Sequence, residues 1–243
     1  MTKEILFLIT ARGGSKGLPG KNLKKIGGLS LVGFKARSAR RSKHCSRLII
    51  STEDPDMQTD AATHGVEVPF TRPVELATDT ATSDAVILHV MDHIESVEHR
   101  HYDAIMVLEP ASPFARGQDY DAAVDIFLRH KASAVLGMRR TDVNSIFVGP
   151  LGANGRADRI VEKFKDTKDR RRQALEPEYT MNGSLYLVRW EIMRKYGEIY
   201  GDPQHTYGYP MDRFHSLEIE TSYDLKLAEF FVQNGCVDMA NWQ

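Results

Sequence analysis

A short apolar run that leads directly into a glycine-rich loop constrains this chain more than any other feature. Residues 5–9 read Ile-Leu-Phe-Leu-Ile, which is typical of a strand buried on both faces. Residues 10–22 follow at once and contain Gly13, Gly14 and Gly17. In a parallel α/β sheet, the loop after the first strand lies where the ligand crevice opens. The sequence therefore predicts an α/β domain with a binding loop at the end of its first strand.

Apolar runs and helical stripes alternate four times in the first part of the chain. Strands are predicted at 48–50, 104–108 and 134–136, and helices at 30–43, 55–64, 84–97 and from an Asp119 cap onward. Such alternation predicts a mostly parallel sheet that is covered by helices on both faces.

The rhythm changes after Gly137. Residues 138–181 carry Gly, Asn, Asp and Arg clusters around short strand-like pieces such as 145–148. Core strands are then predicted at 184–188 and 214–219, and Thr221 is expected to begin a last helix. We interpret 138–181 as an arm inserted in a single domain that spans 1–243.

The charge balance excludes several classes of function. Lys and Arg number 32, Asp and Glu number 33, and the formal net charge is -1. Nonspecific binding to nucleic acid or to a membrane surface therefore has no electrostatic basis. Cys45 and Cys236 are too few for a disulfide framework or a metal cluster. With 42% apolar residues and no recognisable signal peptide, we expect a soluble, cytoplasmic protein.

The loop itself has the composition of a phosphate-binding segment. Its glycines allow backbone N–H groups to approach a phosphate chain closely. Arg12, Lys16 and Lys21 add three cations within ten positions, enough to face a triphosphate. The spacing matches neither the Walker A motif nor the Gly-x-Gly-x-x-Gly dinucleotide fingerprint. An ordinary basic surface loop is the alternative.

Several motifs in order resemble a known family. They are Ala11-Arg-Gly-Gly-Ser-Lys-Gly-Leu-Pro-Gly-Lys-Asn22, Ser51-Thr-Glu-Asp54, Pro69-Phe-Thr-Arg-Pro-Val-Glu-Leu-Ala-Thr-Asp-Thr-Ala-Thr-Ser83, Leu108-Glu-Pro-Ala-Ser-Pro113, Met181-Asn-Gly-Ser-Leu-Tyr186 and Glu218-Ile-Glu-Thr-x-x-Asp-Leu225. Together they resemble the acylneuraminate cytidylyltransferases, or CMP-sialic acid synthetases. The resemblance implies a Rossmann-like nucleotidyltransferase fold and a homodimer in which the 138–181 arm reaches the neighbouring subunit.

The resemblance also implies an activity and a nucleotide site. Such an enzyme transfers CMP from CTP to the anomeric hydroxyl of a nine-carbon acidic (nonulosonic) sugar and releases pyrophosphate. By resemblance, the catalytic cations are Arg12, Lys16 and Lys21. The implied nucleotide-binding residues are Thr10, Ala11, Arg12, Gly13, Asn22, Arg72, Ala81 and Ser83.

A metal site is expected at two carboxylates. Glu218 and Glu220 are two apart on a predicted strand, so their side chains share one face. Paired carboxylates opposite a phosphate loop suit a magnesium ion that bridges phosphate oxygens. The family usually carries aspartates here, which leaves direct or water-mediated ligation open. A solvent-facing acidic strand is the alternative.

The sugar site is expected to differ from that of the family. The residues implied for the sugar are Glu109, Arg172, Asn182 and Tyr186. Glu109 stands where many members have glutamine, and Thr180 where an arginine often helps to hold the acid. These changes add one negative charge and remove one positive charge, so we expect a legionaminic-type or pseudaminic-type acid. The Asp-Arg-Arg-Arg run at 169–172 could supply the lost charge or could be a solvated loop.

Two other functions stay open at this point. The enzyme could use another nucleotide, such as GTP, or an eight-carbon ketodeoxyoctulosonate-type acid. Alternatively, the altered Glu218/Glu220 pair and Thr180 could belong to a catalytically silent module that binds nucleotide without releasing pyrophosphate.

Overall fold

Strands and helices alternate in the computed structural model, which describes residues 3–168 and 171–243. The main six-stranded sheet contains β1 (Ile5–Thr10), β4 (Cys45–Ser51), β5 (Ala104–Leu108), β6 (Ala134–Arg140), β7 (Tyr179–Arg189) and β8 (Thr206–Met211). The α-helices are α1 (Leu31–Arg40), α2 (Pro55–Thr63), α3 (Ser83–Ser96), α4 (Gly117–His130), α5 (Asp158–Asp166), α6 (Trp190–Tyr196) and α7 (Ser222–Gln233). A small ribbon of β2 (Lys25–Ile26) and β3 (Leu29–Ser30) precedes α1.

The main sheet has the strand order β4-β1-β5-β7-β6-β8. β1 pairs in parallel with β4 and β5, and β6 pairs in parallel with β8. β7 runs antiparallel to both of its neighbours, β5 and β6. The predicted mostly parallel sheet is therefore confirmed. Its antiparallel member arises because the chain leaves the sheet along β6, passes through the arm and returns beside the same strand.

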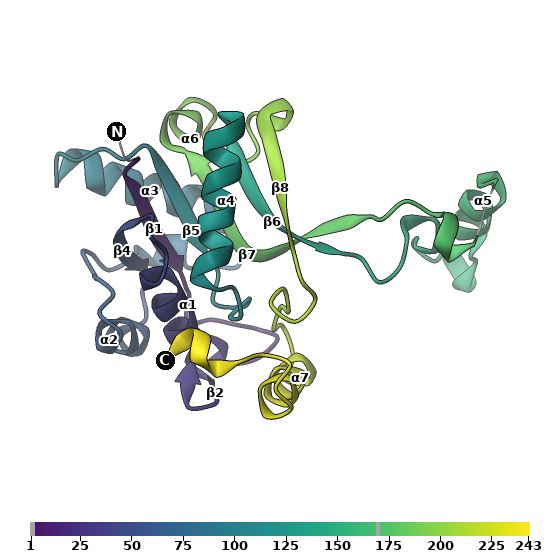
Figure 1. The fold of residues 1–243 in the computed structure, drawn as a ribbon, viewed down its shortest axis with the longest axis horizontal. Coiled ribbons are helices and arrows are strands. Elements are labelled where there is room, and N and C mark those ends of the chain that lie inside the picture. Colours follow the sequence, from purple (N-terminus) through teal and green to yellow (C-terminus); the bar gives the residue numbers. More distant parts are fainter. Residues whose placement is uncertain (1–2, 169–170) are drawn as a thin grey trace.

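Helices cover both faces of this sheet, as predicted (Figure 1). Phe7 and Ile9 of β1 belong to the apolar layer under α1, α2 and α4. Leu6 and Leu8 belong to the layer under α3 and α6. This period-two alternation explains why the whole of residues 5–9 is apolar. No helix within 3–168 or 171–243 is both long and apolar enough to cross a bilayer.

Side-chain caps fix where helices begin. The Ser30 hydroxyl accepts the backbone N–H of Gly33 at 2.8 Å and starts α1. Thr221 and Asp224 form a reciprocal capping box at the start of α7. Each cap satisfies N–H groups that have no partner inside the helix and is worth about 1 kcal/mol. The prediction that Thr221 begins the last helix is confirmed.

The predicted arm extends away from the rest of the domain (Figure 1). β6 and β7 stay paired as far as Arg140 and Tyr179, and α5 lies at the far end. The rings of Phe147 and Phe164 pack near the tip with their centroids 5.5 Å apart. Large apolar side chains remain exposed along the arm, namely Val143, Val148, Leu151, Val161, Tyr179 and Met181.

Residues 214–219, predicted as a core strand, are a turn and an extended segment outside the sheet. The Asp212 carboxylate causes this, because it accepts the backbone N–H groups of Phe214 and His215 at 3.0 and 3.1 Å. β8, which comes just before this turn, fills the sheet edge instead. Gly208 and Pro210 interrupt the apolar pattern of β8, so the sequence does not indicate a strand there.

Two smaller predictions are also wrong. The strand-like piece 145–148 contains the 3-10 turn Ser145–Phe147, which follows an Asn144 cap. Asp119 does not cap α4 but is its third residue, where its carboxylate accepts the N–H of Arg116 at 2.8 Å. Sequence reasoning missed α5 and α6, because nine and seven residues are too few for a periodic apolar pattern to be distinguished.

Candidate active site

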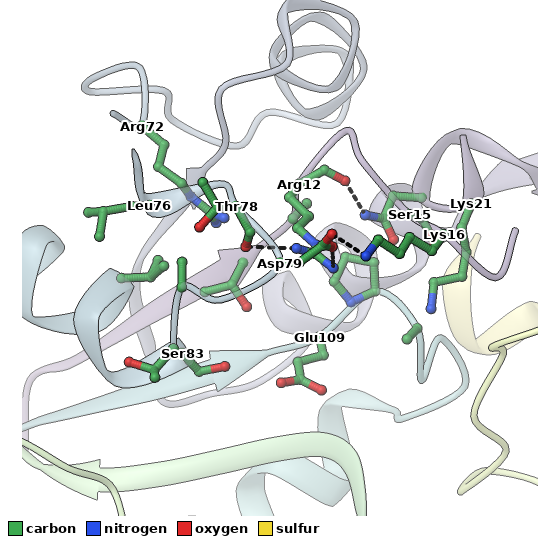
Figure 2. Close-up of a pocket in the computed structure, with 18 of the residues that line it drawn as sticks. Arg12, Ser15, Lys16, Lys21, Arg72, Leu76, Thr78, Asp79, Ser83 and Glu109 are labelled. Atoms are coloured by element: carbon green, nitrogen blue, oxygen red, sulfur yellow. Dashed lines mark hydrogen bonds and ion pairs between the residues drawn. The ribbon is translucent and has the colours of Figure 1, made fainter. Parts of the chain in front are cut away.

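The glycine-rich loop leaves β1 at Thr10 and crosses the carboxyl edge of the sheet (Figure 2). A Cβ atom at Gly17 would lie 2.6 Å from the backbone oxygen of Glu220, so only glycine allows this close approach. Gly13 is turned elsewhere, and its N–H donates to Glu53 Oε1 at 2.7 Å. Gly13 does not line the cavity at this edge, and its contact with nucleotide stays a prediction.

A cavity of about 410 Å³ opens between the loop, the 72–83 segment and the ends of β1 and β5. Its volume is in the usual range for small-molecule sites. It brings together most of the residues that the resemblance implies for nucleotide, namely Thr10, Ala11, Arg12, Asn22, Arg72, Ala81 and Ser83. Lys16, Lys21, Glu109 and Glu220 line the same cavity.

Asp79 is a functional candidate that sequence reasoning missed. Its carboxylate lies 2.9 Å from Arg12 Nη2 and 2.5 Å from Lys16 Nζ (Figure 2). Arg12 Nη1 also donates to the backbone oxygen of Thr78 at 2.8 Å. The hydrogen bond from Lys16 holds the pKa of Asp79 below its usual value. The 72–83 segment thus places an anion between two of the three loop cations that are predicted to face phosphate.

Lys21, the third cation, faces a different group. The Lys21 side chain is buried, and its Nζ lies 2.8 Å from Glu220 Oε1. It belongs to the 3-10 turn Lys21–Leu23 that ends the glycine-rich loop. The structure therefore separates the cations into one pair held by Asp79 and one buried lysine held by Glu220.

Polar groups suited to a nucleobase lie beside the cations. Arg72 is buried, and its Nε donates to Ser51 Oγ at 3.0 Å. Burial lowers the pKa of Arg72 to about 10, so the guanidinium remains protonated at neutral pH. Asn22 is also buried, and its Nδ2 donates to the backbone oxygen of Arg12 at 3.2 Å. These contacts fix the direction of both side chains, as recognition of a planar base requires.

Glu109 follows β5 and lines the cavity opposite the loop (Figure 2). Burial, followed by the charge of Glu218, raises the pKa of Glu109 to about 7. The charge of Lys35 acts against this rise, and Lys35 is a second residue that sequence reasoning missed. This lysine is fully buried on α1, and its Nζ donates to the Ser184 backbone oxygen at 2.8 Å. The sequence does contain one indication of this buried lysine, because Lys35 falls on the apolar face of the helix predicted at 30–43.

Glu218 and Glu220 flank Ile219 in an extended segment that is not a strand of the sheet. Ile219 between them is buried, and its N–H donates to the Ala111 oxygen at 2.7 Å. Burial, together with Glu220, raises the pKa of Glu218. Glu220 lines the cavity, whereas Glu218 lies toward Gly183 and Glu109. Within the described residues, no three Asp, Glu, His or Cys side chains are grouped to hold a metal ion by themselves.

The residues implied for the sugar do not all reach the cavity. Tyr186 is half-buried on β7, and burial followed by the charge of Glu109 raises its pKa. Asn182 is fully buried: its Nδ2 lies 3.3 Å from Met211 Sδ, and its Oδ1 accepts the Ser184 N–H at 3.0 Å. Asn182 therefore braces β7, and its sugar contact stays a prediction. The side chain of Arg172, with residues 169–170, lies outside the described part of the chain.

The site combines a cation-rich loop at the end of β1 with buried polar groups beside it and carboxylates opposite. This combination is that of an enzyme of the nucleotidyltransferase class. A family model described as cytidylyltransferase matches residues 6–133, and the chain belongs to this family.

The chain is also similar to individual proteins over nearly its whole length. The chain is 28% identical over 234 residues to post-translational flagellin modification protein B of Campylobacter coli, covering 95% of each chain. It is 28% identical over 235 residues to CMP-N,N'-diacetyllegionaminic acid synthase of Legionella pneumophila, covering 93% of this chain and 95% of the relative. A solved CMP-2-keto-3-deoxy-manno-octonic acid synthetase complexed with CTP shares the fold, with a TM-score of 0.68 and 14% identity over 96% of this chain and 99% of that one.

Proposed function

We propose that this cytidylyltransferase transfers CMP from CTP to the anomeric hydroxyl of a nonulosonic acid of the legionaminic type. The cavity that joins Arg12, Lys16 and Lys21 to the base-directed groups and to Glu109 carries the proposal. Its volume of about 410 Å³ is sufficient for a nucleotide. In this proposal, the phosphates that leave as pyrophosphate face the loop, and the α-phosphate faces Glu109 and Glu220. The legionaminic relative and the departures at Glu109 and Thr180 support this acceptor class. We further propose a cytoplasmic location, since CTP is made there.

The reaction exchanges one phosphorus–oxygen bond for another. The acceptor hydroxyl oxygen attacks the α-phosphorus of CTP and gives up its proton to solvent, the bond to the β-phosphate oxygen breaks, and pyrophosphate leaves with the electron pair. Arg12, Lys16 and Lys21 neutralise the charge that builds up on this leaving group. Asp79 must release Arg12 and Lys16 when the triphosphate arrives, because all three groups meet at one place.

We also propose that the enzyme uses Mg²⁺. Glu220 and Glu218 would supply carboxylate oxygens, the ligands that this ion prefers, and other oxygen ligands would come from CTP and water. The ion would neutralise phosphate charge during transfer. Chelation with EDTA is expected to stop pyrophosphate release, and added MgCl₂ to restore it. Full activity in EDTA would contradict this assignment.

The decisive experiment measures pyrophosphate release with CTP and Mg²⁺. The acceptors are N-acetylneuraminic, legionaminic and pseudaminic acids and ketodeoxyoctulosonate, each repeated with GTP, ATP and UTP. We expect release with CTP and legionaminic acid, and release with another nine-carbon acid alone would correct the acceptor class. Release with GTP alone, or with ketodeoxyoctulosonate alone, would overturn the substrate assignment. Nucleotide binding without any release would indicate a silent module.

The arm supports a further proposal, that the protein is a homodimer. Val148 and Leu151 on the arm are 51% and 65% exposed, and several exposed apolar side chains gathered on one segment are typical of an association surface. We propose that the arm packs on the neighbouring subunit. Light scattering should give about twice the chain mass of 27.4 kDa. Leu151→Asp should lower this mass, and a monomeric wild-type protein would refute the proposal.

A further inference from the structure

A second cavity, of about 370 Å³, lies at the root of the arm, where β6 and β8 end. Arg139, Arg140 and Arg213 line it, together with Asp142 and Met211. The three arginines give this cavity a cationic lining. The residues discussed above as the nucleotide site do not include any of them.

The charges in this cavity are unevenly paired. Arg213 Nη1 lies 3.0 Å from Asp142 Oδ1, so this arginine is already neutralised. The side chains of Arg139 and Arg140 are exposed and make no hydrogen bond or ion pair with the rest of residues 3–168 and 171–243. An unpaired guanidinium that lines a cavity is well suited to bind a carboxylate, because its N–H groups match the two carboxylate oxygens.

Contacts connect this cavity to the nucleotide site. Arg139 lies opposite Met211 in the β6–β8 ladder, and Met211 Sδ contacts the amide of Asn182. Gly183 comes next, and a Cβ atom placed there would lie 2.8 Å from Glu109 Oε2 and 3.6 Å from Glu218 Oε1. Met211, Asn182 and Gly183 therefore link Arg139 to the place where Glu109 and Glu218 lie.

The register of β6 and β7 adds a second observation. Arg139 is the direct cross-strand neighbour of Thr180, an uncharged residue. Side chains of directly opposed residues lie about 5 Å apart at Cβ and on the same face of the sheet. A positive charge is therefore available at this point of the sheet although β7 itself provides none at Thr180.

An acceptor sugar that carries a carboxylate needs a cation near Glu109 and Glu218. Glu109, Glu218 and Glu220 would repel an incoming carboxylate, and the cations of the glycine-rich loop are engaged with Asp79 and Glu220. In a nonulosonic acid, the carboxylate is attached to the anomeric carbon, which also carries the reacting hydroxyl. A residue that holds the carboxylate next to Glu109 and Glu218 therefore also sets the position of the nucleophile.

We infer that Arg139 binds the carboxylate of the acceptor sugar, in a subsite at the root of the arm. This inference rests on the proposed function and names the residue that makes the site selective for an acidic sugar. Arg140, on the same strand, adds positive potential. Arg213 adds less positive potential to the cavity, because Asp142 neutralises its charge.

The test uses steady-state kinetics with the acid that the wild-type enzyme turns over. Arg139→Gln should raise the KM for this acid by about 10- to 100-fold, as expected for loss of one charged hydrogen bond, and leave the KM for CTP within about twofold. The KM of Arg139→Lys for the acid should lie between those of the wild type and Arg139→Gln. Arg129→Gln is the matched control, because Arg129 is exposed on α4 and loses the same charge. An unchanged KM for the acid in Arg139→Gln overturns the inference.

The methyl ester of the same acid sharpens the test, because it lacks the charge but keeps the hydroxyl. Wild-type and Arg139→Gln enzymes should use the ester equally well, whereas a purely structural defect would persist with the ester and overturn the inference. If no acid is turned over, the proposed function fails, and saturation-transfer NMR with N-acetylneuraminic acid and CTP tests the subsite alone. Binding that is lost in Arg139→Gln upholds the subsite, and absence of wild-type binding overturns it.

Discussion

Replacement of Lys21 by alanine tests the catalytic assignment most directly. Lys21 is 8% exposed and lines the cavity, with its Nζ 2.8 Å from Glu220 Oε1. In the proposed reaction, this ammonium group neutralises charge on the departing pyrophosphate. Loss of one preorganised charge partner typically costs about 3 kcal/mol of transition-state stabilisation, which corresponds to about 150-fold in kcat.

The fold should survive this substitution. Glu220, the ion-pair partner, has a 59% exposed side chain, so water can solvate its carboxylate after Lys21 is removed. An exposed or half-exposed ion pair contributes at most about 1 kcal/mol to the free energy of unfolding. The Lys21 backbone N–H donates to Leu18 O at 3.0 Å, and alanine preserves this bond.

The assay compares kcat for pyrophosphate release with urea unfolding of the same protein. Lys21→Met keeps the length of the side chain without its charge and should lose activity as Lys21→Ala does. Lys25→Ala, at an exposed position on β2, is the control for loss of one lysine. If kcat falls less than about threefold in Lys21→Ala while the fold is intact, the role assigned to Lys21 is refuted.

Two further predictions concern the other charged groups near the cavity. Asp79→Asn should lower the KM for CTP by about two- to fivefold in steady-state assays, because Arg12 and Lys16 then bind the triphosphate without first losing their ion pairs with Asp79. An unchanged or higher KM would show that Asp79 does not compete with phosphate. Burial lowers the pKa of Lys35 from 10.5 to about 7, so the folded chain releases this proton at lower pH than the unfolded chain. The free energy of unfolding should therefore rise by about 2 kcal/mol more in the wild type than in Lys35→Met between pH 7 and pH 9. Equal changes in urea-unfolding experiments would contradict the burial of a charged Lys35.

Local patterns in the sequence determined the frame of the fold. The apolar run at 5–9, the strand at 104–108 and the cap at Thr221 are in the structure where the sequence placed them. These features depend on neighbours a few positions away, through side-chain alternation and capping, and a linear pattern records such neighbours. The three loop cations were recognised for the same reason, since they lie within ten positions.

Contacts between distant segments were decided by the tertiary structure alone. Asp79 meets Arg12 and Lys16 because the 72–83 segment folds over the loop, which no local spacing shows. The turn at Asp212 ended β8 and removed the predicted strand at 214–219, since a side-chain hydrogen bond outweighed the apolar pattern. Arg139 became a candidate when β6 paired with β7 and set it opposite Thr180. Register, burial and ion pairing depend on which segments meet in space, and a sequence read one window at a time does not contain that information.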